Sequence, residues 1–128
     1  MICEYNSYLT FDRSLDIEFL FVEIAPSNWR IYILTDIDYG SRCRDASVVH
    51  RLTEENSTLK TKVKHFVSAL LQTVLTDPVY YICWTKTIPT LDTAHNIASS
   101  WADITAYYIA HGGTFPAIQK TLSDLNVI

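Results

Sequence analysis

The sequence contains little glycine, proline, cysteine or charge. Of its 128 residues, 3 are glycine, 4 are proline and 3 are cysteine, and only 19% carry a charged side chain. The scarcity of glycine and proline excludes a collagen-like or low-complexity chain. A hydrophobic content of 48% with 12% aromatic residues excludes an intrinsically disordered one. The length predicts a single domain, which we place over residues 1–128.

The chain also has no strong charge of either sign and no long hydrophobic run. Its formal net charge is −4, whereas binders of nucleic acid or anionic membranes carry a basic field. No run approaches the roughly 18 apolar residues of a membrane-spanning helix. The first residues lack the basic and then apolar segments of a secretory signal. We therefore expect a cytoplasmic protein that binds neither membrane nor nucleic acid.

Cysteine and histidine are scattered along the chain. Cys3, Cys43 and Cys83 form no C-x-x-C pair, a pattern that indicates reduced thiols rather than a disulfide framework. The four histidines are equally dispersed, whereas a zinc site needs clustered ligands. The sequence therefore predicts no metal site and no other cofactor.

The N-terminal part alternates apolar and polar residues as β-strands do. Residues 15–24 and 29–37 alternate around a short segment that contains Pro26, which predicts an antiparallel hairpin. Residues 8–11 could add an edge strand, and residues 46–52 a further strand. The seven residues 79–85 are rich in aromatic and β-branched side chains, so we expect a central strand in which Trp84 is buried.

Three other segments have helical periodicity. Residues 57–76 carry an apolar stripe that starts after Asn56. Residues 91–111 lie between a capping Thr90 and two glycines, and residues 116–125 form a shorter stripe. The whole pattern predicts an α+β fold, in which an antiparallel β-sheet is packed on one face by two main helices, with a short C-terminal helix.

Alanine recurs at every fourth position of the segment 91–111. At this spacing the alanines form a diagonal ridge that allows close packing. Charge is sparse here too, since residues 65–128 hold six of the 24 charged side chains (10 basic and 14 acidic). The ridge either packs within the chain or contributes to a homodimer interface. The interface hypothesis assigns to it Ala94, Ala98, Trp101, Ala102, Ala106 and Ala110.

A basic cluster precedes the first predicted helix. Arg42, Arg44, His50 and Arg51 lie within ten residues, and guanidinium groups bind phosphate or carboxylate bidentately. Trp84 could stack on a base. These five residues are therefore candidates for binding a small, nucleotide-like anion. The alternative is that the arginines are surface residues paired with neighbouring carboxylates.

No catalytic motif accompanies this cluster, since G-x-S-x-G and a phosphate-binding glycine loop are both missing. Asp92 with His95 and Asp103 lacks an accompanying nucleophile. Cys43 with His50 could form a thiol–imidazole dyad only if the fold brought the two together. The leading hypothesis is a non-enzymatic interaction protein that forms homo-oligomers or occludes a protein partner. By analogy only, an inhibitor encoded by a phage or another mobile element is considered, because compact acidic proteins without site motifs are common among such inhibitors. The alternative is the anion binder, and a small hydrolase is a minor alternative.

Overall fold

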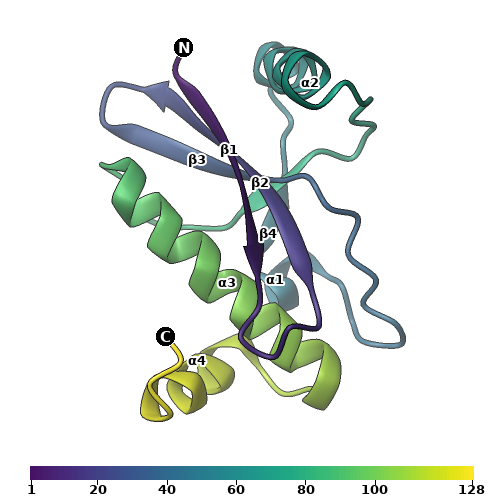
Figure 1. Ribbon diagram of the computed structural model, residues 1–128, viewed down its shortest axis with the longest axis vertical. Helices are drawn as coiled ribbons and strands as arrows, with labels where there is room; N and C mark the ends of the chain where they lie inside the picture. The colour runs from purple at the N-terminus through teal and green to yellow at the C-terminus, as the bar shows by residue number, and fades with distance from the viewer.

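A five-stranded antiparallel sheet organises the chain, and helices cover both of its faces. The computed structural model describes residues 1–128 (Figure 1). In chain order the elements are β1 (Cys3–Leu9), β2 (Asp16–Ala25), β3 (Asn28–Ile33), α1 (Ala46–Val49), β4 (Arg51–Thr53), α2 (Ser57–Leu71), β5 (Tyr80–Ile82), α3 (Leu91–His111) and α4 (Phe115–Asp124). The strands lie in the order β1-β2-β3-β5-β4, and every pair is antiparallel. The predicted α+β class, with two long helices and a short C-terminal one, is confirmed.

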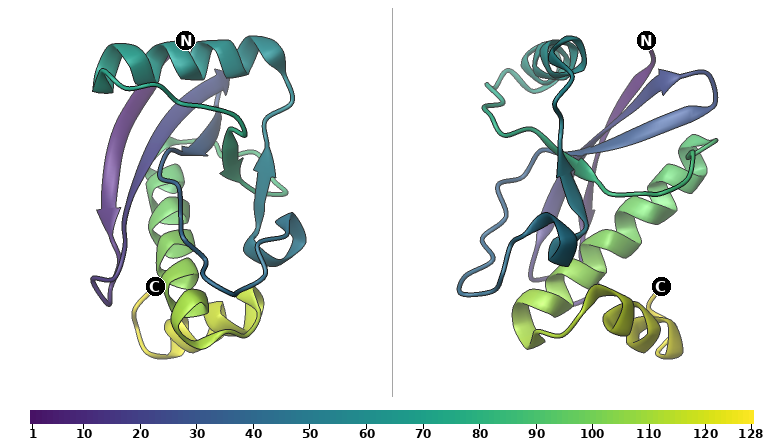
Figure 2. Two further views of the ribbon diagram at one scale, coloured as in Figure 1. Left: turned by 90° about the vertical axis from the view of Figure 1, so that its right-hand side faces the viewer. Right: turned by 180° about the vertical axis from the view of Figure 1, so that it is seen from behind.

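The two long helices lie on opposite faces of the sheet, so the prediction that both cover one face is wrong (Figure 2). Val63 and Val67 of α2 pack in a core of 6 buried residues on one face, whereas α3 and α4 close a core of 21 on the other. The reason lies in β2. Its run from Phe19 to Val22 is apolar at four successive positions, and a strand of this kind needs cover on both faces.

Three other segments differ from their predictions. Residues 46–52 form a helical turn and a short strand, because His50 between them is left-handed with a φ of 50°. The helix α2 ends early, at Leu71, since Gln72 is also left-handed. β5 has only three residues, and Trp84, which was predicted to be buried, lies beyond its end and is 50% exposed.

The alanine ridge of α3 packs within the chain. Four of its five alanines are buried, namely Ala94, Ala98, Ala102 and Ala106. Trp101 is buried as well, and its indole Nε1 donates a hydrogen bond to the backbone carbonyl of Val49 at 3.1 Å. Only Ala110 is exposed. The ridge therefore offers a second copy of the chain almost no surface.

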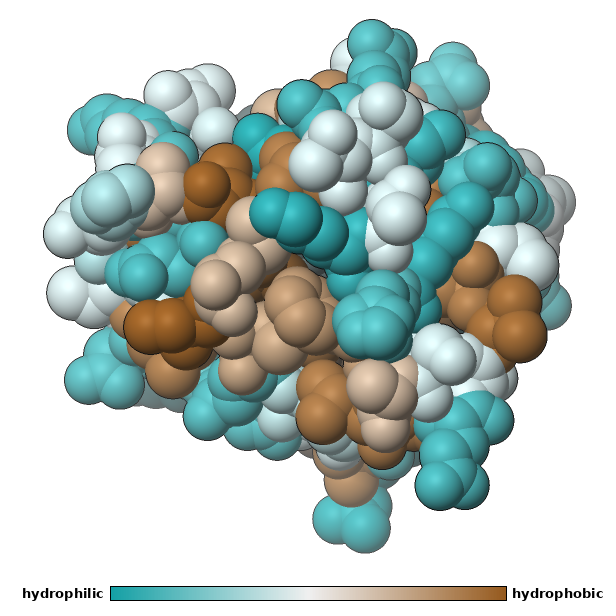
Figure 3. Space-filling model, turned by 90° about the horizontal axis from the view of Figure 1, so that it is seen from above, coloured by the Kyte–Doolittle hydropathy of each residue, from teal (hydrophilic) through white to brown (hydrophobic).

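The end of the molecule that carries α2 and the start of β1 is mixed in character. Seen from above, its apolar side chains form separate patches between hydrophilic ones (Figure 3). None of the helices combines the length and the hydropathy needed to span a bilayer.

We expect Ala102→Leu to lower the free energy of unfolding by about 1–3 kcal/mol, because a larger side chain overpacks this buried position. Ala110→Leu on the same ridge is the control, and its exposed position predicts a change below about 0.5 kcal/mol. Urea denaturation followed by circular dichroism measures both variants. Equal losses would contradict a ridge that is buried within one chain.

Candidate ligand-binding site

The sheet opens between β3 and the chain that follows β5. β3 and β5 pair at only two positions, and after Ile82 the chain moves away from β3. It returns at Ile88, whose backbone carbonyl accepts a hydrogen bond from the backbone N–H of Trp29 at 2.9 Å. Residues 83–87 lie between these points as a loop. Part of β3 therefore borders an opening instead of a neighbouring strand.

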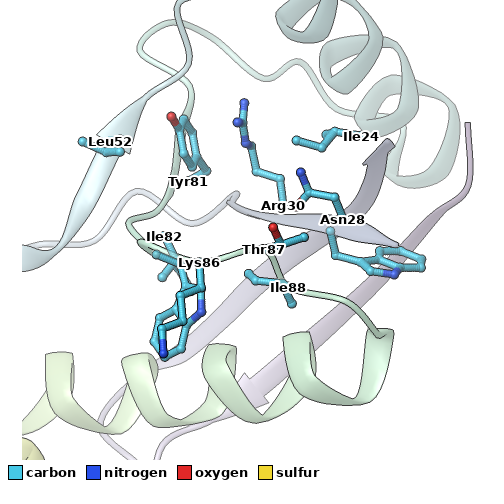
Figure 4. Close-up of a pocket in the computed structure, with 11 residues that line it drawn as sticks. Ile24, Asn28, Arg30, Leu52, Tyr81, Ile82, Lys86, Thr87 and Ile88 are labelled. Carbon is cyan, nitrogen blue, oxygen red and sulfur yellow. The ribbon is translucent and has the colours of Figure 1, made fainter. Parts of the chain in front are cut away.

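This opening is a pocket of about 270 Å³, here called the first pocket (Figure 4). Its lining comes from the end of β2, from β3, β4 and β5, and from the loop that follows β5. Arg30 and Tyr81 lie next to each other on one side of the pocket, and Lys86 lies near Ile82 on the side closer to α3 (Figure 4). The first pocket thus combines cationic and aromatic side chains.

A second pocket of about 220 Å³ lies between the same loop and the helices α3 and α4. Its lining is apolar at positions such as Ile97 and Phe115, and polar at Asn96, Ser100 and Gln119. Trp84 and Ile82 line both pockets. Because Trp84 is half-exposed, its indole ring is accessible where the two pockets meet.

A buried carboxylate holds one wall of the first pocket in place. Glu54 Oε1 accepts hydrogen bonds of 2.6 Å from Arg30 Nη1 and from the Tyr32 hydroxyl, and Arg30 Cζ lies 4.2 Å from the centre of the Tyr81 ring. Burial by itself raises the pKa of Glu54, but the hydrogen bonds from Tyr32 and Arg30 outweigh it and lower the pKa below its ordinary value. Burial and the hydrogen bond to Glu54 both raise the pKa of Tyr32.

The charge of Arg30 is therefore compensated within the protein, whereas that of Lys86 is not. Burial by itself lowers the pKa of Arg30. The hydrogen bond to Glu54 and the charge of Glu54 outweigh this effect and raise the pKa above its ordinary value, so the guanidinium stays charged. Lys86 is exposed and forms no ion pair. It is thus the cation of the first pocket that remains available to an anion.

The basic cluster of the sequence does not converge on one site. His50 and Trp84 meet in the second pocket, but the three arginines line neither pocket. Arg42 Nε donates a hydrogen bond of 3.3 Å to the carbonyl of Ile109, near the C-terminus of α3, where a cation complements the helix dipole.

The other two arginines differ strongly in exposure. Arg44 is exposed on the loop before α1. Arg51 is buried, with its guanidinium carbon 3.8 Å from the centre of the Tyr80 ring and 5.0 Å from that of Tyr39. Neither one forms an ion pair with the carboxylates suggested by the sequence.

Two of the three α3 side chains considered for catalysis, His95 and Asp103, have structural contacts. His95 Nε2 lies 2.6 Å from Glu4 Oε2 on β1, and Asp92 is exposed. The buried carboxylate of Asp103 accepts hydrogen bonds from the Phe11 backbone N–H at 2.8 Å and from the Tyr8 hydroxyl at 3.0 Å. These contacts attach β1 and the following turn to α3.

The thiol that shares a pocket with His50 is Cys83 rather than Cys43. The Cys83 backbone N–H donates a hydrogen bond to the His50 carbonyl at 2.8 Å, whereas the Cys43 carbonyl accepts one from the Tyr108 hydroxyl. No three histidine, cysteine, aspartate or glutamate side chains come together as a metal site would require.

Two cationic residues of the first pocket, Arg30 and Lys86, were missed by the sequence interpretation. Lys86 had a detectable signal, because it is the one charged residue between Asp77 and Asp92, in a segment rich in aromatic side chains. Arg30 had none, since it occupies an ordinary polar position in an alternating strand.

No family model, curated protein or solved structure matches the chain. The chemistry of the site follows from its geometry alone. An accessible indole can stack on a planar ring, and a free ammonium group attracts an anion. The arrangement around Trp84 combines both properties within one crevice.

We expect the free energy of unfolding to decrease as the pH falls below 4.5, the ordinary pKa of the Glu54 side chain. The pKa of Glu54 is lowered in the folded state, so ionisation stabilises the fold above that pH and protonation removes the stabilisation on acidification. Glu54→Gln should be less stable than the wild type at neutral pH and should approach it in acid. Urea denaturation over a pH series measures both curves.

Glu55→Gln is the matched control, because Glu55 is the exposed neighbour of Glu54. This variant should keep the pH dependence of the wild type. If the curve of Glu54→Gln instead ran parallel to that of the wild type at all pH values, the buried carboxylate would not have the role assigned to it.

Proposed function

We propose that the protein binds a small, planar, negatively charged ligand of the nucleotide type in the crevice formed by the two pockets around Trp84. The observation that carries this proposal is the position of Trp84, half-exposed where the two pockets meet. Lys86, a cation without an ion-pair partner, lines the first of these pockets. The proposal keeps Trp84 and His50 from the sequence hypothesis and replaces its three arginines by Lys86 and Arg30.

The indole of Trp84 would supply the main apolar contact. A half-exposed tryptophan leaves a large apolar surface in contact with water, and a planar ligand that stacks on it removes that surface. Stacking of a base on an aromatic side chain contributes about 1–3 kcal/mol and accepts any base. The indole is also rigid, so ordering it on binding has a small entropic cost.

Lys86 and Arg30 would favour an anionic substituent on the ligand. Lysine binds phosphate as a point charge, and Lys86 has no carboxylate competing for it. Arg30 adds positive charge on the opposite side of the first pocket, although Glu54 neutralises most of it. A single anionic group near Lys86 therefore matches the charge of the site.

The second pocket would hold the planar ring system. Apolar side chains with a few polar groups at fixed positions are typical of small-molecule sites. Asn96, Ser100 and Gln119 present donors and acceptors, which suit the polar edge of a heterocyclic ring. Ile97 and Phe115 provide the apolar contacts.

Isothermal titration calorimetry with adenosine monophosphate tests this function, with adenosine and inorganic phosphate as the two halves of the probe. We expect the monophosphate to bind more tightly than either half. Trp84→Ala should weaken its binding about 5- to 150-fold, the equivalent of about 1–3 kcal/mol. Lys86→Gln should reduce the affinity for the monophosphate to that for adenosine, because the charge contact is lost.

Arg44→Gln is the matched control, since it removes an exposed cation that lines neither pocket. It should bind the monophosphate as the wild type does. Circular dichroism establishes that each variant is folded. Absence of binding to the wild type, or an equal loss in Arg44→Gln and Lys86→Gln, would contradict the proposal.

A further inference from the structure

The strand β1 forms a free edge of the sheet (Figure 2). The hydrogen bonds between β1 and β2 show which residues of β1 direct their backbone N–H and carbonyl groups away from the sheet. The carbonyl of Ile2 accepts a bond from the Glu23 N–H, and the Thr10 N–H donates to the Leu15 carbonyl. Because hydrogen-bonded residues alternate in an antiparallel pair, even-numbered residues bond to β2. The odd-numbered residues of β1 direct their backbone groups outward, and these are Cys3, Tyr5, Ser7 and Leu9.

This edge lacks the features that usually protect an exposed strand. Natural edge strands carry lysine, proline or a bulge that prevents pairing with another chain. β1 has no lysine and no proline, and its pairing with β2 shows no register shift. Its one charged residue, Glu4, lies against His95 of α3. Four large apolar side chains along or beside the strand are exposed, with fractions of 53% for Met1, 62% for Ile2, 44% for Leu9 and 43% for Phe11.

We propose that β1 pairs with β1 of a second copy of the chain, antiparallel and about a two-fold axis at Asn6, so that the two sheets become one. The occupant is a second copy because the strand is complementary to itself. A two-fold axis at Asn6 pairs the strand along its whole length. It places Cys3 opposite the partner's Leu9, and Tyr5 opposite the partner's Ser7. Each of the four residues whose backbone groups point outward then lies opposite another such residue of the partner, as the alternation of hydrogen bonds in an antiparallel pair requires.

The side chains agree with the same register. Glu4 of each copy comes opposite the partner's Tyr8, so the two carboxylates do not face each other, and like charges directly opposite would be unfavourable. Ile2 comes opposite the partner's Thr10, at the end of the paired strands where the partner's Leu9 and Phe11 lie. On one face of the joined sheet Ile2 lies beside the partner's Thr10, and on the other face Leu9 lies beside the partner's Cys3. Both exposed apolar side chains thereby lose contact with water.

One local contact has to change when the strands pair. The outward N–H of Ser7 donates a hydrogen bond to the Asn6 side-chain oxygen at 2.8 Å. Pairing replaces this bond by one to the partner's backbone carbonyl and releases the two Asn6 side chains on the two-fold axis. Their amides can then bond to each other or to water. The association is therefore expected to be reversible and dependent on concentration.

Light scattering of the wild type over a concentration series is the first test, and the mass should rise toward twice that of one chain. Ser7→Pro should remain monomeric, because proline removes an outward N–H that makes no bond to β2. Ser7→Ala keeps that N–H and should associate as the wild type does. A wild type with the mass of one chain at every concentration, or a Ser7→Pro variant that still dimerises, would overturn the proposal.

A second variant tests the register and does not depend on the folding of Ser7→Pro. Leu9→Cys places a thiol opposite Cys3 of the second copy. Opposite residues of a hydrogen-bonded pair lie about 5.5 Å apart at Cα, within the range of about 4.4–6.8 Å that a disulfide spans. Oxidised glutathione should convert this variant to a covalent dimer on non-reducing gels. The control with Leu9→Cys and Cys3→Ser should stay monomeric on the gel, and equal cross-linking of the two would overturn the register.

Discussion

The buried carboxylate of Glu54 holds together the parts of the fold on which the crevice depends. It accepts hydrogen bonds from Arg30 and Tyr32 of β3, and from the backbone N–H of Asn56, the N-cap of α2. Its own backbone N–H donates to Val79 just before β5. A buried charge is tolerated only when it is paired and hydrogen-bonded. Glu54 meets this condition and at the same time keeps Arg30 against Tyr81.

The crevice results from a short strand beside a long one. β5 pairs with β3 over two positions only, and the chain then leaves the sheet and returns at Ile88. This departure exposes Trp84 and places Lys86 at the opening. An exposed tryptophan breaks the local rule that large apolar side chains are buried, and natural proteins break such rules mainly at functional or strained sites. The two pockets that meet at Trp84 support a functional origin of this exposure.

Local patterns predicted the elements, whereas the site depends on contacts between distant parts of the chain. The hairpin followed from alternation around Pro26, and α3 from its cap at Thr90, because both signals act over a few residues. Trp84 was misplaced because the end of β5 is determined by pairing across the sheet, which an aromatic run does not encode. The burial of Arg51 was missed for a similar reason, since the rings that contact it come from the loop after β3, at Tyr39, and from β5, at Tyr80.

The most direct test of the account is the chemical-shift change of each backbone and indole N–H group when adenosine monophosphate is titrated into the protein. We expect the largest changes at the Trp84 indole, at Lys86, and at Asn96 and Ser100 of the second pocket, with smaller ones at Arg30. Changes confined to the loop that carries Arg42 and Arg44, or no changes at saturating ligand, would contradict a binding crevice at the opening of the sheet.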